Sequence, residues 1–332
     1  MSNDKITIND VAEALGISKT TVSRAISGKG RISEETTKRV MDFINEHNYK
    51  PSLLAKGLAN QRTYNVAVVW PMDYDFVELP FLQQAMIGMS EVLKEYDNDI
   101  LICMVKGSNI DQLDRIVKNN KVDGVILTRT MVKDAAAQYL KKSGIPFVAI
   151  GSSEDKKVIT IDDDNYTACK ELTKILAGKG LGKIALLGGS KDVAITNTRF
   201  KGYSDALKES ESELDESIVY YDVDSEQKVL GILDDLRNKS VKIAICMDDS
   251  ICASVLSVCR SSGIRIPDQL KLASFYDSKF LSNATPAVTS LSFDDRQLGR
   301  EAATLMMDLI EGREVSKRTI STYEIILKES TK

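Results

Sequence analysis

The sequence has a single histidine among 332 residues, and this scarcity removes several classes of enzyme. His47 has no cysteine or histidine partner nearby, so we expect neither a zinc site nor a histidine-based catalytic triad. The chain also lacks a G-x-S-x-G nucleophile turn, and its Gly188-Gly-Ser190 turn lacks the spacing and lysine of a phosphate-binding P-loop. We therefore expect no enzyme, no metal and no other cofactor.

Long apolar runs are also absent. Runs such as Val66–Trp70 are far shorter than the roughly 18 residues that cross a membrane, and residues 1–5 lack the apolar core of a secretory signal. The five cysteines form no C-x-x-C pair and stand mostly in apolar runs, as buried, reduced thiols do. These features predict a cytoplasmic protein with no membrane partner.

Charge is unevenly distributed along the chain. Residues 1–62 contain ten Lys and Arg against seven Asp and Glu, although the whole chain has a formal net charge of −4. A basic N-terminal segment followed by an acidic remainder is consistent with a polyanionic partner at one end of the chain, although many solvated surfaces have the same balance of charge.

The first fifty residues predict three short helices. One apolar face recurs at helical spacing up to Gly16, a second helix is expected over residues 19–27 with Ser18 as its cap, and a third begins after Ser33. Three helices with a tight glycine turn between the first two predict a helix-turn-helix unit. The pattern alone also fits a small helical bundle with no role in DNA binding.

The motifs of this region resemble those of the lactose/galactose repressor (LacI/GalR) family of bacterial transcription regulators. The resemblance is carried by Ile8-Asn-Asp-Val-Ala-Glu-Ala-Leu-Gly-Ile-Ser18, Thr21-Val-Ser-Arg24, Tyr49-Lys-Pro51 and Ala55-Lys-Gly-Leu58. Mild departures from the family pattern stand at Ser27, Thr37, Ser52 and Lys56. The resemblance implies that double-stranded operator DNA is the partner of residues 1–62.

Contacts with DNA can be predicted for individual side chains. A recognition helix enters the major groove with its N-terminal residues toward the bases, which places Lys19 and Thr20 there. One turn later, Arg24 can pair with a guanine through two hydrogen bonds. The resemblance assigns base reading to the same three positions. The full set of predicted DNA-binding residues is Lys19, Thr20, Thr21, Arg24, Lys29, Tyr49 and Leu58.

Residues 51–62 are expected to link this unit to the rest of the chain. Ser52 can cap a helix over Leu53–Asn60, which is too short to be stable alone. The resemblance implies that this helix folds on DNA as one of a pair and that Leu58 wedges between base steps in the minor groove. The pattern alone fits a plain amphipathic linker equally well.

From residue 66 onward, short apolar strands alternate with helices, and this order is typical of parallel, doubly wound sheets. Strands are expected over residues 66–70, 100–104, 124–127, 147–150, 183–187, 218–221, 243–246 and 270–275. Helices are expected over residues 81–95, 110–119, 132–143, 166–178, 198–209, 227–237 and 251–262. The number of units suffices for two similar lobes.

The fold class expected is therefore α/β, with a two-lobed body like a periplasmic binding protein behind an all-α headpiece. The family resemblance continues through Pro80-Phe81, Val122–Leu127, Ile161–Asn165, Arg199–Tyr203, Ile266–Leu270 and Thr285–Ser290. The expected domains are residues 1–50 for DNA binding, 51–62 for the hinge, 63–161 with 293–318 for the N-terminal lobe, and 162–292 with 319–330 for the C-terminal lobe.

An effector site is expected between the lobes, because ligands of open α/β sheets bind at the carboxyl ends of the strands. The residues assigned to it are Phe81, Asp164, Arg199, Asp248, Tyr276 and Phe293. Asp248, Tyr276 and Phe293 stand where the family usually has Asn, Asp and Gln. Carboxylates beside aromatic rings suit a sugar or another polyol, while a nucleobase or a phosphoprotein corepressor stays open.

Together these features predict a transcription regulator, most simply a repressor, that is controlled by a small effector. A homodimer is expected because a palindromic operator requires a two-fold protein and one headpiece offers few phosphate contacts. A transport-type solute-binding protein would fit the body but not residues 1–62.

Overall fold

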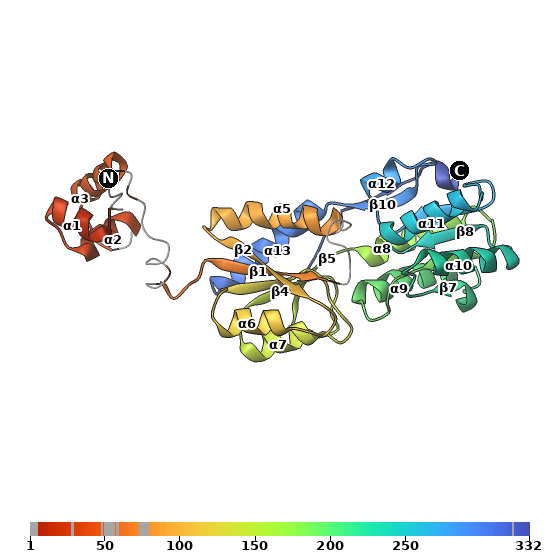
Figure 1. The fold of residues 1–332 in the computed structure, drawn as a ribbon, viewed down its shortest axis with the longest axis horizontal. Helices are drawn as coiled ribbons and strands as arrows, with labels where there is room; N and C mark the ends of the chain where they lie inside the picture. The colour runs from red at the N-terminus through yellow and green to blue at the C-terminus, as the bar shows by residue number, and fades with distance from the viewer. Residues whose placement is uncertain are drawn as a thin grey trace. The chain divides into compact units, whose positions relative to one another are not determined.

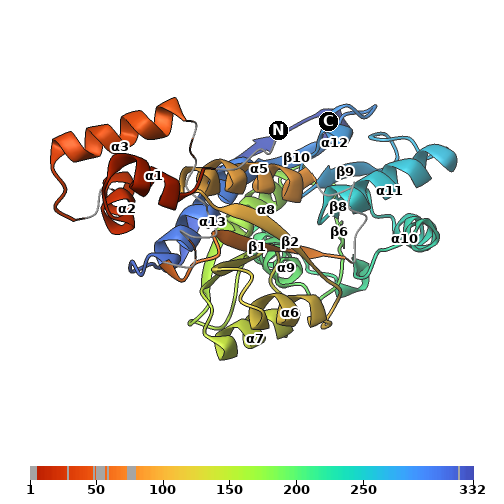
Figure 2. The same cartoon turned by 60° about the vertical axis from the view of Figure 1, so that its left-hand side comes forward.

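A computed structural model describes residues 6–27, 30–47, 49, 57, 60–72, 80–320 and 322–332. The chain divides into two compact units, Met1–Thr63 and Tyr64–Lys332, which we call the headpiece and the body. Figures 1 and 2 show the elements of each unit from two directions. The alternation of strands and helices expected from residue 66 onward therefore falls within the second unit.

The headpiece contains the three predicted helices, α1 (Ile8–Leu15), α2 (Lys19–Ser27) and α3 (Glu34–Glu46). Their apolar faces meet in one small core, formed by Val11, Ala12, Val22, Ala25, Val40, Ile44 and Tyr49. The side chain of Ser18 accepts a hydrogen bond from the Thr21 amide at 3.1 Å and caps α2, as expected.

Gly16 makes the tight turn between α1 and α2. Its backbone lies in the left-handed region at φ 63°, which a side chain would disfavour. The Gly16 amide donates to the Glu13 carbonyl at 3.2 Å, and the Ile17 amide donates to the Ala12 carbonyl at 3.0 Å. The glycine thus ends the first helix with its last carbonyls satisfied and sets the start of the second.

The body contains two sheets, as the sequence predicted, and each has six strands. The first sheet has the order β11 (Arg318–Ile320), β5 (Ile159–Asp163), β4 (Phe147–Ile150), β3 (Gly124–Leu127), β1 (Asn65–Pro71) and β2 (Asp99–Val105). The second has the order β12 (Tyr323–Ile326), β10 (Thr289–Phe293), β9 (Lys271–Ser274), β8 (Ile243–Cys246), β6 (Ile184–Leu187) and β7 (Val219–Tyr220). All pairs are parallel except β10 with β12.

Helices cover both faces of each sheet and define two lobes. The N-lobe has the first sheet with α5 (Pro80–Glu95), α6 (Asp111–Lys118), α7 (Ala135–Ser143) and α13 (Asp295–Ile310). The C-lobe has the second sheet with α8 (Asn165–Ala177), α9 (Ala194–Glu209), α10 (Glu226–Asn238), α11 (Asp249–Ser261) and α12 (Lys279–Ser282). In the N-lobe, α5 and α13 lie on one face of the sheet and α6 and α7 on the other (Figure 1). Two short 3-10 turns, η2 (Glu216–Ile218) and η3 (Glu329–Thr331), complete the C-lobe.

The chain passes between the lobes after β5, after β10 and between β11 and β12. Strands β5, β10, β11 and β12 are absent from the strands expected from apolar runs, because polar residues interrupt each one. Helix α9 begins at Ala194 rather than at residue 198, so Arg199 lies in its second turn. These differences matter because the crossing segments border the ligand cavity described below.

Two glycines allow α5 and α13 to cross at backbone contact. A Cβ atom on Gly88 would lie 2.0 Å from the carbonyl oxygen of Arg296, and one on Gly299 would lie 2.0 Å from that of Ala85. Neither position can hold a side chain without moving a helix. This crossing holds α13, which begins beside the cavity, against the rest of the N-lobe.

Candidate functional site: the cavity between the lobes of the body, and helix α2 of the headpiece

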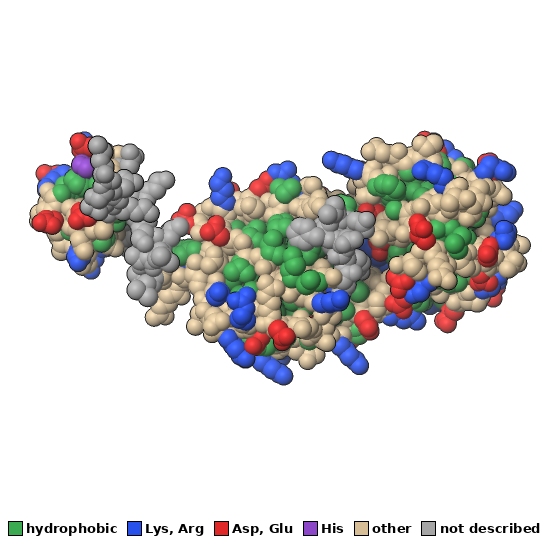
Figure 3. Space-filling model, viewed as in Figure 1, with side chains coloured by type: hydrophobic (Ala, Val, Ile, Leu, Met, Phe, Trp, Pro, Cys, Tyr) green, Lys and Arg blue, Asp and Glu red, His purple; other side chains and the backbone are tan. Residues whose placement is uncertain are grey.

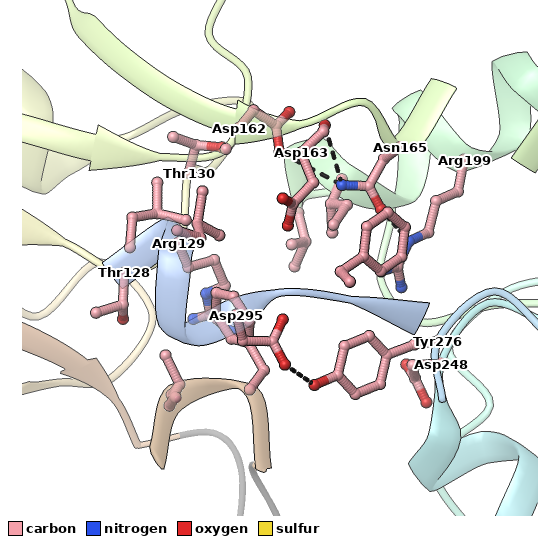
Figure 4. Close-up of a pocket in the computed structure, with 18 of the residues that line it drawn as sticks. Thr128, Arg129, Thr130, Asp162, Asp163, Asn165, Arg199, Asp248, Tyr276 and Asp295 are labelled. Carbon is pink, nitrogen blue, oxygen red and sulfur yellow. Dashed lines mark hydrogen bonds between the residues drawn. The ribbon is translucent and has the colours of Figure 1, made fainter. Parts of the chain in front are cut away.

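A cavity of about 210 Å³ lies where the carboxyl ends of the strands of both sheets face one another (Figure 4). At about 30 Å³ for each water molecule in the liquid, this space equals roughly seven waters, which is room for a small organic ligand. The N-lobe contributes residues that follow β1, β3, β4 and β5, and the C-lobe contributes residues that follow β6, β8 and β9. Its position is the one predicted from strand topology.

The two lobes are in direct contact beside this cavity. A backbone bridge joins Met131 of the N-lobe to Val193 of the C-lobe. The Val132 amide donates to the Asp192 carbonyl at 2.8 Å, and the Ala194 amide donates to the Thr130 carbonyl at 3.1 Å. The cavity is therefore bounded by groups whose separation depends on how the lobes meet.

Arg199 is a buried charged group in the cavity wall. It is 8% exposed and projects from α9. Its Nε donates to Oδ1 of Asn165 at 3.2 Å, and its Nη1 donates to the backbone oxygen of Met247. These contacts hold the guanidinium plane in one orientation, which pre-organises it for a ligand with paired oxygen atoms.

Five carboxyl groups line the same cavity, from Asp162, Asp163, Asp248, Asp249 and Asp295. Burial raises the pKa of Asp162 to about 7 and that of Asp163 to about 8. Burial also raises the pKa of Asp249 and of Asp295 to about 6 each, and raises that of Asp248. The site therefore collects groups that water solvates poorly and that a ligand can satisfy.

Tyr276 contacts both a carboxyl group, that of Asp295, and an aromatic ring, that of Phe293. Its hydroxyl donates to Oδ2 of Asp295 at 2.5 Å, and burial raises its pKa. Its ring lies nearly parallel to that of Phe293, with 6.5 Å between centroids and 10° between planes. Together with Phe81, these rings give the cavity apolar surface beside its carboxyl groups.

Five of the six residues assigned to the effector line this cavity, namely Phe81, Arg199, Asp248, Tyr276 and Phe293. The sixth, Asp164, is not among the residues of the wall, so its assignment to the effector stays a prediction. Its Oδ1 accepts the Thr167 amide at 3.1 Å and caps α8. The neighbouring Asp162, Asp163 and Asn165 line the cavity instead.

Sequence reasoning also missed Thr128, Arg129, Thr130 and Asp295, which line the cavity from the N-lobe. The three residues 128–130 directly follow β3, so the rule that ligands meet strand ends could have found them. Asp295 is the first residue of α13, immediately after the crossing from β10, and no apolar run marked that crossing.

In the headpiece, α2 presents the residues expected to read bases. Lys19, Thr20 and Arg24 are exposed, and Thr21 is half-buried with its hydroxyl 2.8 Å from that of Ser18. Tyr49 is 8% exposed and packs in the headpiece core. The other two assigned residues, Lys29 and Leu58, lie outside the described residues, as does most of the expected Leu53–Asn60 helix.

Several features limit the chemistry available. The five cysteines are buried, free thiols. Within the described ranges, no group of three or more His, Cys, Asp and Glu residues is arranged to hold a metal ion. The helices of those same ranges include none long and apolar enough to cross a membrane.

On the face of the body seen in Figure 3, basic and acidic side chains are interspersed.

A helix-turn-helix unit joined to a two-lobed α/β body with a cavity between its lobes defines a ligand-responsive DNA-binding regulator. The profile of bacterial regulatory proteins of the lacI family matches residues 7–52, and that of periplasmic binding protein-like domains matches residues 173–331. The chain belongs to the LacI family. It is a transcription regulator and not an enzyme, as the sequence predicted.

Individual relatives agree with this assignment. The regulator MalR of Streptococcus pneumoniae is 34% identical over 219 residues, which cover 65% of this chain and 67% of MalR. RegA of Clostridium saccharobutylicum is 26% identical over 98% of both chains. The structure of a CelR–cellobiose complex has 28% identity, a TM-score of 0.73 and coverage of 98% and 99%. The lac repressor dimer bound to operator, at 20% identity, shares the fold with a TM-score of 0.81 over 99% of each chain.

Proposed function

We propose that this chain is a cytoplasmic repressor that binds a palindromic operator as a homodimer and responds to a small effector held between its lobes. The observation that carries this proposal is the cavity, whose wall combines Arg199, Asp248 and Tyr276 of the C-lobe with Phe81 and Asp295 of the N-lobe. An effector that touches both lobes binds best at one lobe separation, and this differential affinity is what control of DNA binding requires.

The effector class proposed is a sugar or a sugar derivative. Carboxyl groups accept hydrogen bonds from hydroxyls, the Arg199 guanidinium donates to ring or hydroxyl oxygens, and aromatic rings cover the apolar face of a sugar. The CelR structure named above is a complex with cellobiose, a disaccharide. A nucleobase or a phosphoprotein corepressor would be the alternative outcome of the effector assay below.

The operator is proposed to be read by α2. Its exposed Lys19, Thr20 and Arg24 can reach base edges if the helix lies in the major groove, as in other helix-turn-helix proteins. Thr21 and Lys29 are proposed to contact phosphates, and Tyr49 is proposed to pack against α3 and reach a phosphate. Leu58 is proposed as the wedge in the minor groove. The expected domain limits, residues 1–50, 51–62 and the two lobes, belong to the same proposal.

A homodimer follows from the geometry of operator DNA. A single helix-turn-helix contacts one half-site, and two half-sites about 34 Å apart require two recognition helices related by a two-fold axis. The lac repressor, whose fold this chain shares, is a dimer in the structure with its operator.

The proposal is tested by fluorescence anisotropy with the full chain and duplex DNA from upstream of its own gene. We expect specific binding to a two-fold symmetric sequence, and a change in affinity on adding one sugar from a panel of mono- and disaccharides. Full-length protein that binds this DNA no better than random DNA would contradict the DNA-binding part. Specific binding that no sugar changes, but that a nucleobase or a phosphoprotein does, would contradict the effector part alone.

A further inference from the structure

Two carboxyl groups at the cavity have an oxygen atom without a partner. Asp163 ends β5 and Asp295 begins α13, and they are 6% and 9% exposed. Oδ1 of each is buried and accepts no hydrogen bond within the described part of the chain. A buried, unsatisfied carboxylate oxygen is costly, so a ligand that supplies hydrogen-bond donors at this point is favoured.

Both groups face the same space. In Figure 4 the carboxyl groups of Asp163 and Asp295 point into the cavity from opposite sides. Repulsion from Asp295 and Asp162 adds to burial in raising the pKa of Asp163. The second oxygen of Asp295 is occupied by Tyr276, so Oδ1 is left for a ligand.

Acidic side chains outnumber basic ones in the cavity wall. Five carboxyl groups and two guanidinium groups, from Arg129 and Arg199, line it. The raised pKa of Asp163 keeps this group protonated near neutral pH, and a neutral polyol would leave it so. An ammonium group supplies both hydrogen-bond donors and a positive charge, so it would lower the pKa of Asp163 and could bond two carboxylates at once.

We propose that the effector carries an ammonium group, as an amino sugar does, and that the buried carboxylates of Asp163 and Asp295 hold it. This inference rests on the proposed function, since it names the class of ligand that the cavity between the lobes takes. The rest of such a ligand would lie against Tyr276 and Phe293, with its hydroxyls toward Arg199 and Asp248.

The test compares matched ligands on the unaltered full chain by isothermal titration calorimetry. The probes are glucosamine, galactosamine and mannosamine, each measured beside its parent hexose and its N-acetyl derivative, which lack the charge. We expect at least one amine to bind at least tenfold more tightly than both of its neutral counterparts. Neutral sugars that bind as tightly as their amines would overturn the inference, and so would failure of all three amines to bind.

Variants locate the ammonium group. Asp163→Asn and Asp295→Asn should each remove most of the preference for the amine. Asp268→Asn, which alters an exposed carboxylate paired with Arg265, should keep it. A preference that survives in both cavity variants would overturn the assignment to these residues. Specific operator binding is measured on the same samples, so failure of the amine preference with operator binding intact leaves the proposed function standing.

Discussion

The hydroxyl of Tyr276 donates a 2.5 Å hydrogen bond to Oδ2 of Asp295, and this bond joins the C-lobe to the N-lobe across the ligand cavity. Tyr276 follows β9 of the C-lobe, whereas Asp295 begins α13, which packs in the N-lobe. The two residues are 19 positions apart in sequence, on either side of the crossing strand β10. A change in lobe separation must lengthen or break this bond.

Replacing Tyr276 with Phe should therefore cost stability. The change removes the donor to Oδ2 of the buried Asp295 carboxyl group, whose Oδ1 already has no partner among the described residues. The expected cost is about 1–3 kcal/mol in the free energy of unfolding. Tyr166→Phe is a matched control, because it removes a 3.0 Å bond to Asp205 at a less buried position and should cost less. Urea denaturation of the full chain gives both values, and equal losses would contradict a special role for the bond between the lobes.

Arg199→Ala should abolish the response to the effector while basal operator affinity stays within a few-fold of the unaltered chain. The guanidinium lies in the cavity wall of the body, and the operator contacts belong to a separate folded unit. A thermal melt first shows that the variant is folded. Its affinity for the operator is then measured by fluorescence anisotropy with and without effector. A variant that responds at the same effector concentration as the unaltered chain would show that Arg199 does not bind the effector.

Arg24→Ala should weaken specific operator binding by about 1–3 kcal/mol and leave affinity for random DNA nearly unchanged, because a base contact is lost. Lys29→Ala should weaken both alike, as loss of a phosphate contact does. Dissociation constants for the two DNAs at one salt concentration separate these patterns. Equal losses of affinity for operator and random DNA in Arg24→Ala would show that Arg24 contacts the DNA backbone and not a base.

The stability of the unliganded chain should fall as the pH rises from 6 to 8.5. Burial, with Asp295, Asp162 and Asp294 nearby, raises the pKa of Asp163 to about 8, against the opposing effect of Arg199. The folded state therefore holds a proton that the unfolded state has already lost, so rising pH favours unfolding up to the folded pKa. The urea midpoint measured across this range should drop less in Asp163→Asn. A midpoint that rises with pH would contradict the burial of this group.

Gly299→Ala should destabilise the body by about 1–3 kcal/mol, because its Cβ would meet the Ala85 carbonyl at 2.0 Å and force α5 and α13 apart. Gly231→Ala is the matched control. It also lies in a helix, α10, but a Cβ there meets no atom within 4 Å, so the change should be neutral or stabilising. Similar melting temperatures for the two variants would show that the helix crossing is not tight.

The fold was largely predictable from the sequence, and the site was predictable in part. Apolar runs such as Gly124–Leu127 are buried on both faces, so their pattern alone marks them as central strands. Polar crossing strands such as Ile159–Asp163 gave no such signal, and the neighbouring acids of that segment could not be ranked by spacing. Asp164 was chosen from the motif, yet its carboxyl group caps α8, and the neighbouring Asp163 lines the cavity.

The most direct measurement is selection of DNA from a random duplex library by the full chain, followed by anisotropy with the selected sequence. We predict a two-fold symmetric site whose affinity exceeds that for random DNA by at least a thousandfold, and a preference that is smaller by about 1–3 kcal/mol in Arg24→Ala. Selection that yields no common sequence, or a site bound equally well by Arg24→Ala, would contradict operator recognition by α2.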